Sequence, residues 1–288
     1  MTTTTAELVI TQPGIYDIPE DTYHADPIPG GSLSSSSARR LLQPAGPAKY
    51  RWEQDHAPAP KKTFEIGSAA HQLVLGAGPE LVLIDADEWR TNKIKEEVAA
   101  VRERGAIPLK PADHQAVHDM AAALRRHPLA SALLDPDHGQ PEKTLIWQDP
   151  ATGVWRRARL DWLPHPGDGR LIVADYKTTA SAAPHDVAKS VAAYGYHCQQ
   201  PWYLDGVEAL GLAEQPVMVF IFQEKTAPYL VNVVAIDPDA VRAGRELNRR
   251  ALDLYADCVA TGIWPGYGDE IHDITLPRWA TTVYEETL

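Results

Sequence analysis

Residues 154–163 read VWRRARLDWL and residues 170–177 read RLIVADYK, with a Pro- and Gly-rich stretch between them. Both runs are short, apolar and rich in β-branched or aromatic side chains, which predicts two strands joined by a turn. Asp161 and Asp175 lie 14 positions apart, so such a hairpin can bring their carboxylates side by side. Lys177 follows Asp175 by two positions and shares its face of the strand, whereas Tyr176 points the other way.

Two carboxylates and one lysine at the end of a hairpin can hold a hard cation beside a phosphate. Oxygen ligands, completed by waters and a substrate phosphate, suit Mg²⁺ or Mn²⁺. Lys177 can orient or help to deprotonate an attacking water, and it can offset charge that develops on the phosphate. The backbone carbonyl of Tyr176 can reach the same ion. The hairpin therefore indicates a metal-dependent site around Asp161 and Asp175.

Three other features support this interpretation. Gln199 and Tyr203 have a spacing of four, which places both on one face of the helix predicted after the strand, where they can contact a substrate or order a water. His71 lies on a predicted helix rich in small residues and can serve as an additional metal ligand. Glu142 precedes the first predicted strand, and the sequence leaves open whether it binds the metal directly, contacts a ligand of the metal, or is exposed beside Lys143.

The order of predicted elements is helix, three strands, helix, strand, which is typical of an α/β or mixed α+β core built on a mixed sheet. We expect a single domain over residues 33–262, with a helical insertion at about 86–130. Residues 1–32 are rich in Thr, Pro, Gly and Asp and predict an irregular N-terminal arm. Residues 263–288 predict an irregular C-terminal tail.

The net charge of −12 argues against indiscriminate binding to polyanions, but charge is unevenly distributed. From Arg39 to Lys62 six basic residues stand against two acids. Phosphate contacts supply sequence-independent affinity for DNA. The candidate contacts are Arg39, Arg40, Lys61 and Lys62 in that segment, and Arg156, Arg157 and Arg159 in the first strand of the hairpin.

Several motifs are missing from the chain. It has no G-x-x-x-x-G-K-[S/T] motif, which argues against an ATP-driven motor and predicts ATP-independent chemistry. Two cysteines exclude a disulfide framework or a four-cysteine iron–sulfur cluster and fit a reducing compartment such as the cytoplasm. No long apolar run or signal-like N-terminus is present, so we expect no membrane association.

Four pieces of the chain occur together in the order that a known group of nucleases uses. They are GSAAH at residues 67–71, RLD at 159–161, DYKTT at 175–179 and YHCQQPWY at 196–203, which contains a Q-x-x-x-Y motif. Together they resemble the PD-(D/E)XK nuclease superfamily, and more closely its RecE-type (exonuclease VIII-like) branch from phage recombination systems. The resemblance extends from about residue 15 to about residue 280.

The resemblance implies a restriction-endonuclease-like αβββαβ core whose mixed central sheet is flanked by helices. It implies metal-dependent 5′–3′ digestion of linear double-stranded DNA from its ends, leaving 3′ single-stranded tails. By motif match the metal ligands would be His71, Asp161, Asp175 and the Tyr176 carbonyl. Lys177 would serve the attacking water, and Gln199 and Tyr203 would position water, lysine or DNA.

The same resemblance implies partners and a location. A RecT-like single-strand annealing protein would receive the product, and several copies of the chain would form a homo-oligomer, in RecE-type enzymes a ring-shaped tetramer. A phage-encoded enzyme of this kind would act in the host cell cytoplasm.

Two alternatives remain at this stage. One is a catalytically silent protein that binds DNA ends on the same scaffold, although the complete set of Asp161, Asp175 and Lys177 argues against it. The other is a structure-selective DNA endonuclease, which activity on closed circular DNA would distinguish from an end-dependent exonuclease.

Overall fold

The hairpin lies at the centre of a six-stranded mixed sheet in the computed structural model, which describes residues 8–56, 65–167 and 169–280. The strand order is β1 (Gly14–Tyr16), β4 (Gly139–Gln148), β5 (Trp155–Pro164), β6 (Ile172–Thr179), β7 (Val217–Glu224) and β8 (Val231–Val234). Neighbouring strands are antiparallel except β6 and β7, which are parallel. The mixed sheet flanked by helices confirms the predicted fold class.

A helical crossover joins the two parallel strands, as parallel pairing requires. It consists of α8 (Pro184–Tyr194) and α9 (Tyr196–Ala209), which are separated at Gly195. Gly195 has a φ of 70°, so it can end one helix and begin the next at an abrupt change of direction. This turn places Gln199, in the first turns of α9, over the carboxyl half of β6.

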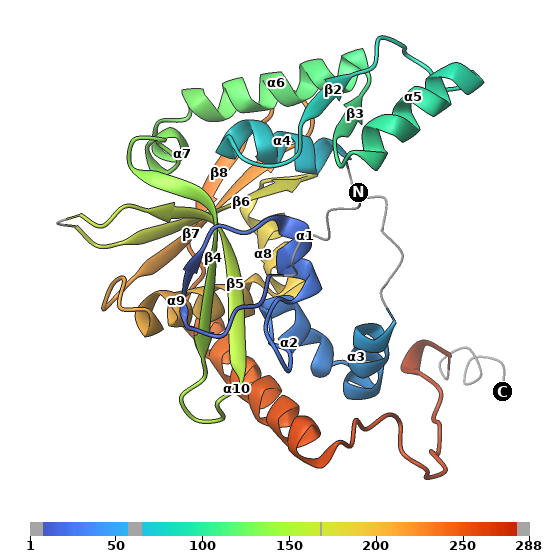
Figure 1. Ribbon diagram of the computed structural model, residues 1–288, viewed down its shortest axis with the longest axis vertical. Coiled ribbons are helices and arrows are strands. Elements are labelled where there is room, and N and C mark those ends of the chain that lie inside the picture. Colours follow the sequence, from blue (N-terminus) through green and yellow to red (C-terminus); the bar gives the residue numbers. More distant parts are fainter. Residues whose placement is uncertain (1–7, 57–64, 168, 281–288) are drawn as a thin grey trace, which may run out of the picture.

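Helices cover both faces of the sheet (Figure 1). On one face lie α9, α10 (Pro238–Thr261), α2 (Ser35–Leu41) and α3 (Gly46–Asp55), packed on a core that includes Trp147, Trp202, Phe220 and Phe222. On the other face lie α4 (Glu65–Leu75), α6 (Pro111–Arg126) and α7 (Pro128–Leu133). Their core includes Ala70, Met120, Trp162, Tyr176 and Ile221. The sheet therefore separates two apolar cores.

The described part of the N-terminal segment, residues 8–32, is not irregular throughout as predicted, because it contains a short strand and a short helix. Strand β1 pairs with β4, and α1 (Glu20–Ala25) follows it. Ile10, Ile18 and Tyr23 are buried against Ile146 of β4. The apolar residues of this segment are isolated among Pro, Gly and Thr, so no helix or strand period revealed them.

The insertion between α4 and the sheet is mixed rather than purely helical. It contains α5 (Asn92–Glu103) and α6, but also β3 (Ile107–Leu109), which pairs in parallel with β2 (Leu81–Leu83). The amide of Gln223 in β7 joins it to the sheet by donating to Met120 O at 2.9 Å. The side-chain oxygen of Gln223, Oε1, accepts from Tyr176 Oη at 2.6 Å.

The C-terminal tail carries little regular structure up to residue 280, although its start is fixed to the body. Trp264 stacks on Tyr50 of α3 and meets Tyr255 of α10 edge-on, with ring centroids 5.8 Å apart in both pairs. Among the described helices, none combines the length and the apolar content that crossing a membrane demands.

Helices α9 and α10 make a close backbone contact at Gly244. A Cβ at this position would lie 1.8 Å from the carbonyl oxygen of His197. Asn248, one turn later, donates to Cys198 O at 2.9 Å and fixes the same helix pair. The first turn of α9, which carries Gln199, is therefore held in place by α10.

Gly244→Ala should lower the free energy of unfolding by about 1–3 kcal/mol, the usual cost of forcing an extra carbon into a packed contact. Gly266→Ala is the control, because a Cβ there meets only Ala48 Cβ at 3.7 Å. Urea melts followed by circular dichroism would measure both. An unchanged midpoint in Gly244→Ala would contradict the close packing of α9 on α10.

Candidate metal centre

The candidate site lies where β5 and β6 separate. Their registered pair is Trp162 opposite Ala174, and Asp161 and Asp175 come next in that register. Instead of a ladder bond, a carboxylate oxygen of Asp161 accepts the N–H of Tyr176 at 2.8 Å. The gap between the two strands is thus lined by side-chain carboxylates, as the hairpin pattern predicted.

His71 reaches this gap from α4. Its Nε2 lies 3.2 Å from Asp161 Oδ2, and its Nδ1 lies 3.2 Å from Glu142 Oε1. The helix can lie close to the sheet because Ala69 and Ala70, just before His71, are small and fully buried. One potential ligand atom from each of His71, Glu142 and Asp161 lies within 4.8 Å of the others.

Asp175 is almost fully buried and is contacted from the opposite face. Lys177 Nζ lies 2.5 Å from its Oδ2, and Gln199 donates to its Oδ1 at 2.5 Å. The Oδ2 atom forms this ion pair but has no hydrogen bond of ordinary geometry. Each carboxylate oxygen of Asp175 is therefore in contact with a polar side chain.

The pKa values of Asp175 and Asp161 are shifted in opposite directions. Burial raises the pKa of Asp175, and the nearby negative charge of Asp161 raises it further against the opposing effect of Lys177. For Asp161, burial also raises the pKa, but the charges of His71 and Lys177 and the Tyr176 amide outweigh it and lower the pKa. Asp161 is thus the member of the pair that stays ionised.

The two basic groups remain charged for the complementary reason. Burial alone would lower the pKa of Lys177, but Asp175 and Asp161 outweigh burial and raise it. The pKa of His71 is also raised, because Asp161 and Glu142 outweigh the effect of its burial. Positive charge on Lys177 and His71 therefore offsets the negative charge of the carboxylates around them.

This donor set fits a divalent cation. Carboxylate oxygens suit Mg²⁺ and Mn²⁺, and an imidazole nitrogen is compatible with Mn²⁺ and later transition metals. By motif match the residues that would hold the ion are His71, Asp161 and Asp175, and Asp175 Oδ2 would have to exchange its contact with Lys177 Nζ for the ion. His71 must lose its extra proton to become a ligand. The Tyr176 carbonyl remains a predicted ligand.

Tyr203 lies one turn after Gln199, as their spacing predicted. Burial raises the pKa of Tyr203, as do its neighbours Tyr23, Asp175 and Asp161, so its phenol stays neutral. Its ring packs against the apolar core beneath the site. Gln199 therefore contacts Asp175 directly, as predicted. Tyr203, on the same face of α9, is largely buried.

Two of the arginines predicted to contact DNA are buried, and that prediction is wrong for them. The Arg156 guanidinium lies between the Trp147 and Trp202 rings, 4.8 and 4.1 Å from their centroids, and pairs with Asp205 at 3.0 Å. Arg157 pairs with Asp26 at 2.7 Å. Their side chains are 4% and 7% exposed, so neither presents a charge to a DNA backbone.

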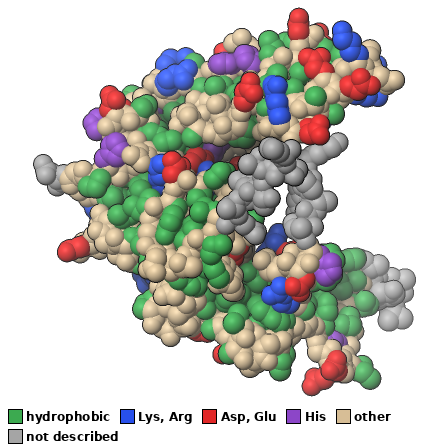
Figure 2. Space-filling view, viewed as in Figure 1, with side chains coloured by type: hydrophobic (Ala, Val, Ile, Leu, Met, Phe, Trp, Pro, Cys, Tyr) green, Lys and Arg blue, Asp and Glu red, His purple; other side chains and the backbone are tan. Residues whose placement is uncertain are grey.

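The remaining candidates differ in their surroundings. Arg159 is engaged by Glu142 rather than by solvent. Arg40 is exposed and pairs with Glu53, while Arg39 is half-buried beside Gly195 at the start of α9. Lys61 and Lys62 lie outside the described residues. On the face seen in Figure 2, the Lys and Arg side chains are scattered among Asp and Glu.

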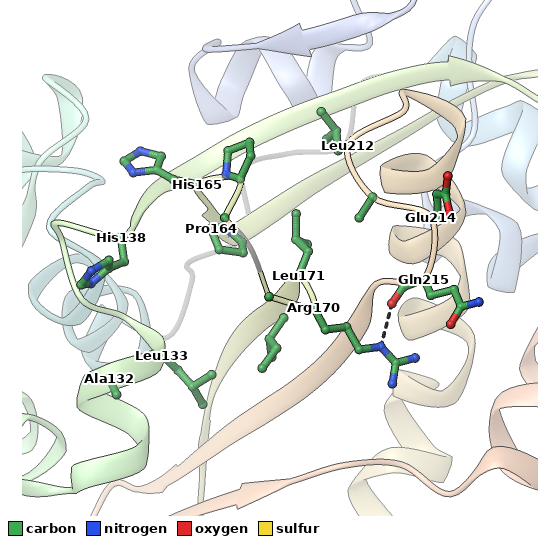
Figure 3. A pocket seen from close by; sticks show the side chains of 15 residues that line it. Ala132, Leu133, His138, Pro164, His165, Arg170, Leu171, Leu212, Glu214 and Gln215 are labelled. Atoms are coloured by element: carbon green, nitrogen blue, oxygen red, sulfur yellow. Dashed lines mark hydrogen bonds between the residues drawn. The ribbon is translucent and has the colours of Figure 1, made fainter.

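An open groove of about 810 Å³ lies beyond the β5–β6 turn, at the end of the sheet (Figure 3). His138, His165 and Arg170 lie on its wall, and Arg170 Nε donates to Gln215 O at 2.7 Å. None of the residues that line it belongs to the carboxylate cluster. The groove is therefore a neighbour of the metal centre and not part of it.

A mixed sheet with one aspartate on each of two adjacent central strands, and a lysine two residues after the second, defines a PD-(D/E)XK-type protein. This chain belongs to the family described as "PDDEXK-like domain of unknown function (DUF3799)", whose model matches residues 34–276. That match covers most of the chain and places it in the PD-(D/E)XK nuclease superfamily.

One solved structure shares this fold. A crystal structure from Eubacterium rectale described as a "Putative exonuclease" is similar with a TM-score of 0.56 and 12% identity, covering 93% of this chain and 98% of that one. The crystal structure of SSO0001 matches at a TM-score of 0.28 and 13% identity, covering 77% of this chain and 87% of that one. A comparison with curated proteins gave no match.

Glu142 has a left-handed backbone, with a φ of 58°. Glu142→Gly and Glu142→Ala both remove the carboxylate, but only glycine adopts this conformation without a Cβ penalty. We expect the glycine variant to be more stable than the alanine variant by about 1 kcal/mol, since the left-handed region disfavours L-residues by that order. Urea melts would measure the difference. Equal stability would show that the strain is absent in solution.

Proposed function

We propose that this protein is a metal-dependent deoxyribonuclease that digests linear double-stranded DNA from its ends in the 5′–3′ direction. The observation that carries the proposal is the cluster of buried Asp175 with half-buried Asp161 and Lys177 at the divergence of β5 and β6. Membership of a PDDEXK-like family supports the nuclease chemistry. The RecE-like sequence motifs support the polarity, and the description of the Eubacterium rectale protein agrees with exonuclease activity.

A divalent cation held by His71, Asp161 and Asp175 would supply Lewis-acid polarisation of the phosphodiester and activation of water. Gln199 holds the Asp175 carboxylate through its Oδ1, and Lys177 contacts its Oδ2. Tyr203, neutral and largely buried, supports the helix that carries Gln199. Together these residues fix the ligand geometry before DNA arrives, which is how preorganised charge lowers a barrier.

Lys177 acts through its positive charge. Its pKa is raised by Asp175 and Asp161, so in this arrangement the ammonium group is a poor general base. It can orient the attacking water and offset negative charge that develops on the phosphate. Of the two roles that the sequence left open for Lys177, the structure therefore favours orientation over proton removal.

The finer features of the proposal rest on the resemblance to RecE-type enzymes. The product would be a 3′ single-stranded tail received by a RecT-like annealing protein, and several copies of the chain would assemble, as a ring-shaped tetramer in those enzymes. Two free, buried cysteines, Cys198 and Cys258, support action in a reducing compartment such as a host cell cytoplasm.

Asp161→Asn and Asp175→Asn should each lower the release of acid-soluble nucleotides from linear duplex DNA at least about 100-fold, the order of effect when one charge-stabilising group is lost. Chelation of Mg²⁺ or Mn²⁺ should abolish release from the wild type. Asp253→Asn is the control, since this exposed carboxylate lies on α10, away from the cluster. Wild-type turnover in both site variants would refute the site. DNA binding without any nucleotide release by the wild type would favour the silent end-binding alternative.

Digestion should depend on a free end. Covalently closed circular DNA should resist the enzyme, and the same plasmid cut once should be degraded, with a 5′ label released before a 3′ label. Gel electrophoresis with singly labelled substrates would measure both properties. Cutting of the closed circle at a rate comparable to the linear form would favour the structure-selective endonuclease.

A further inference from the structure

A line of polar contacts connects His71 to the N-terminal segment. Glu142 Oε1 lies 3.2 Å from His71 Nδ1, and Arg159 Nε donates to Glu142 Oε2 at 2.5 Å. An Nη1 group of Arg159 then donates to the backbone carbonyl of Ile18 at 2.7 Å. The chemistry proposed above uses neither Arg159 nor Glu142 directly, although both lie beside a metal ligand.

The side chains of this line are shielded from water, so their hydrogen bonds can hold the orientation of the His71 ring. The side chains of His71, Glu142 and Arg159 are only 28%, 15% and 17% exposed. Charge-assisted hydrogen bonds are stronger in such surroundings than in solvent. Glu142 is also held in its left-handed backbone conformation, a strain that proteins retain where the surroundings require it.

The far end of the line is anchored by secondary structure. Ile18 is buried and directly follows the segment in which Tyr16 pairs with Thr144 of β4. Asp17 forms an ion pair with Lys143 at 3.0 Å. The Ile18 carbonyl therefore has a fixed position relative to the strand that carries Glu142.

Both carboxylate oxygens of Glu142 are already engaged, one by His71 and the other by Arg159. The two ring nitrogens of His71 face different carboxylates, Nδ1 facing Glu142 and Nε2 facing Asp161. A metal-ligating histidine commonly gives its second ring nitrogen to a carboxylate, which fixes the ring and its tautomer. Because Glu142 meets the ring nitrogen that faces away from Asp161, its placement fits an orienting role.

We propose that Glu142 and Arg159 are positioning residues that hold the His71 ring through Nδ1, so that Nε2 is presented to the metal beside Asp161. The N-terminal segment is the support on which this arrangement rests, through the carbonyl of Ile18. The inference depends on the proposed metal centre, but it concerns how one ligand is oriented and not which substrate is cut.

The test compares two variants. Arg159→Met removes the donors to Glu142 and to the Ile18 carbonyl but keeps a side chain of similar length, whereas Arg159→Lys keeps the charge but cannot make both hydrogen bonds at once. Asp21→Asn is the matched control, because it alters an exposed carboxylate of the same segment that accepts, among the described residues, only from Thr22 and does not touch the line to His71. Mn²⁺ affinity would be measured by electron paramagnetic resonance. The exchange rate of the His71 Nδ1 proton would be measured by NMR in the metal-free proteins.

Arg159→Met should weaken Mn²⁺ binding about 10-fold, within the range for loss of a residue that orients a ligand, while Arg159→Lys should lose less. The Nδ1 proton should exchange slowly in the wild type and in Asp21→Asn, and fast in Arg159→Met. Circular dichroism would confirm that each variant is folded.

Wild-type Mn²⁺ affinity and a slowly exchanging Nδ1 proton in folded Arg159→Met would overturn the inference while leaving the metal centre intact. If the wild type binds no Mn²⁺, the metal centre itself fails, and the NMR comparison still decides whether Arg159 and Glu142 hold the ring. Equal loss of affinity in Asp21→Asn would assign the effect to general loosening of the segment and would also reject the inference.

Discussion

Asp161 and Asp175 are held in one poorly solvated gap between adjacent strands, and contacts from several elements offset the repulsion between their negative charges. Bringing like charges together out of water is costly unless opposite charge or hydrogen bonds compensate. Here Asp161 is compensated by His71 and a backbone amide, and Asp175 by Lys177 and Gln199. Each partner comes from a different element, so the site exists only when the sheet and its covering helices are assembled.

The position of the site between two apolar cores explains its rigidity. His71 belongs to a helix on one face of the sheet and Gln199 to a helix on the other, and each helix is fixed by its own packing. Close contact at Gly244 fixes α9, while small residues let α4 lie against the strands. Sites that are built on rigid elements and supported by a surrounding layer of contacts keep their geometry.

The sequence predicted those parts of the site that depend on local periodicity. The hairpin, the Asp175–Lys177 pair and the Gln199–Tyr203 face follow from strand and helix spacing, and the structure places them together. The arginines were misread because their partners are distant in sequence: Asp205 for Arg156, and Asp26 for Arg157. The group of Ile18 that accepts from Arg159 is its backbone carbonyl, which every residue type has, so the sequence cannot predict this contact. The strand β1 is too short and too interrupted by Pro and Gly to show a period.

The burial of Arg156 between two tryptophans has a consequence for how the protein meets a polyanion. Positive charges that are neutralised inside the fold contribute little to the external potential, and the chain carries a net charge of −12. Within about a Debye length, roughly 8 Å at physiological salt, the net negative charge opposes the approach of DNA, and at larger separations this repulsion is screened. Added salt screens this repulsion before it weakens any close phosphate contact. For the DNA-end substrate proposed above, encounter and retention should thus respond to ionic strength in opposite directions, because short-range contacts and not diffuse attraction would favour binding.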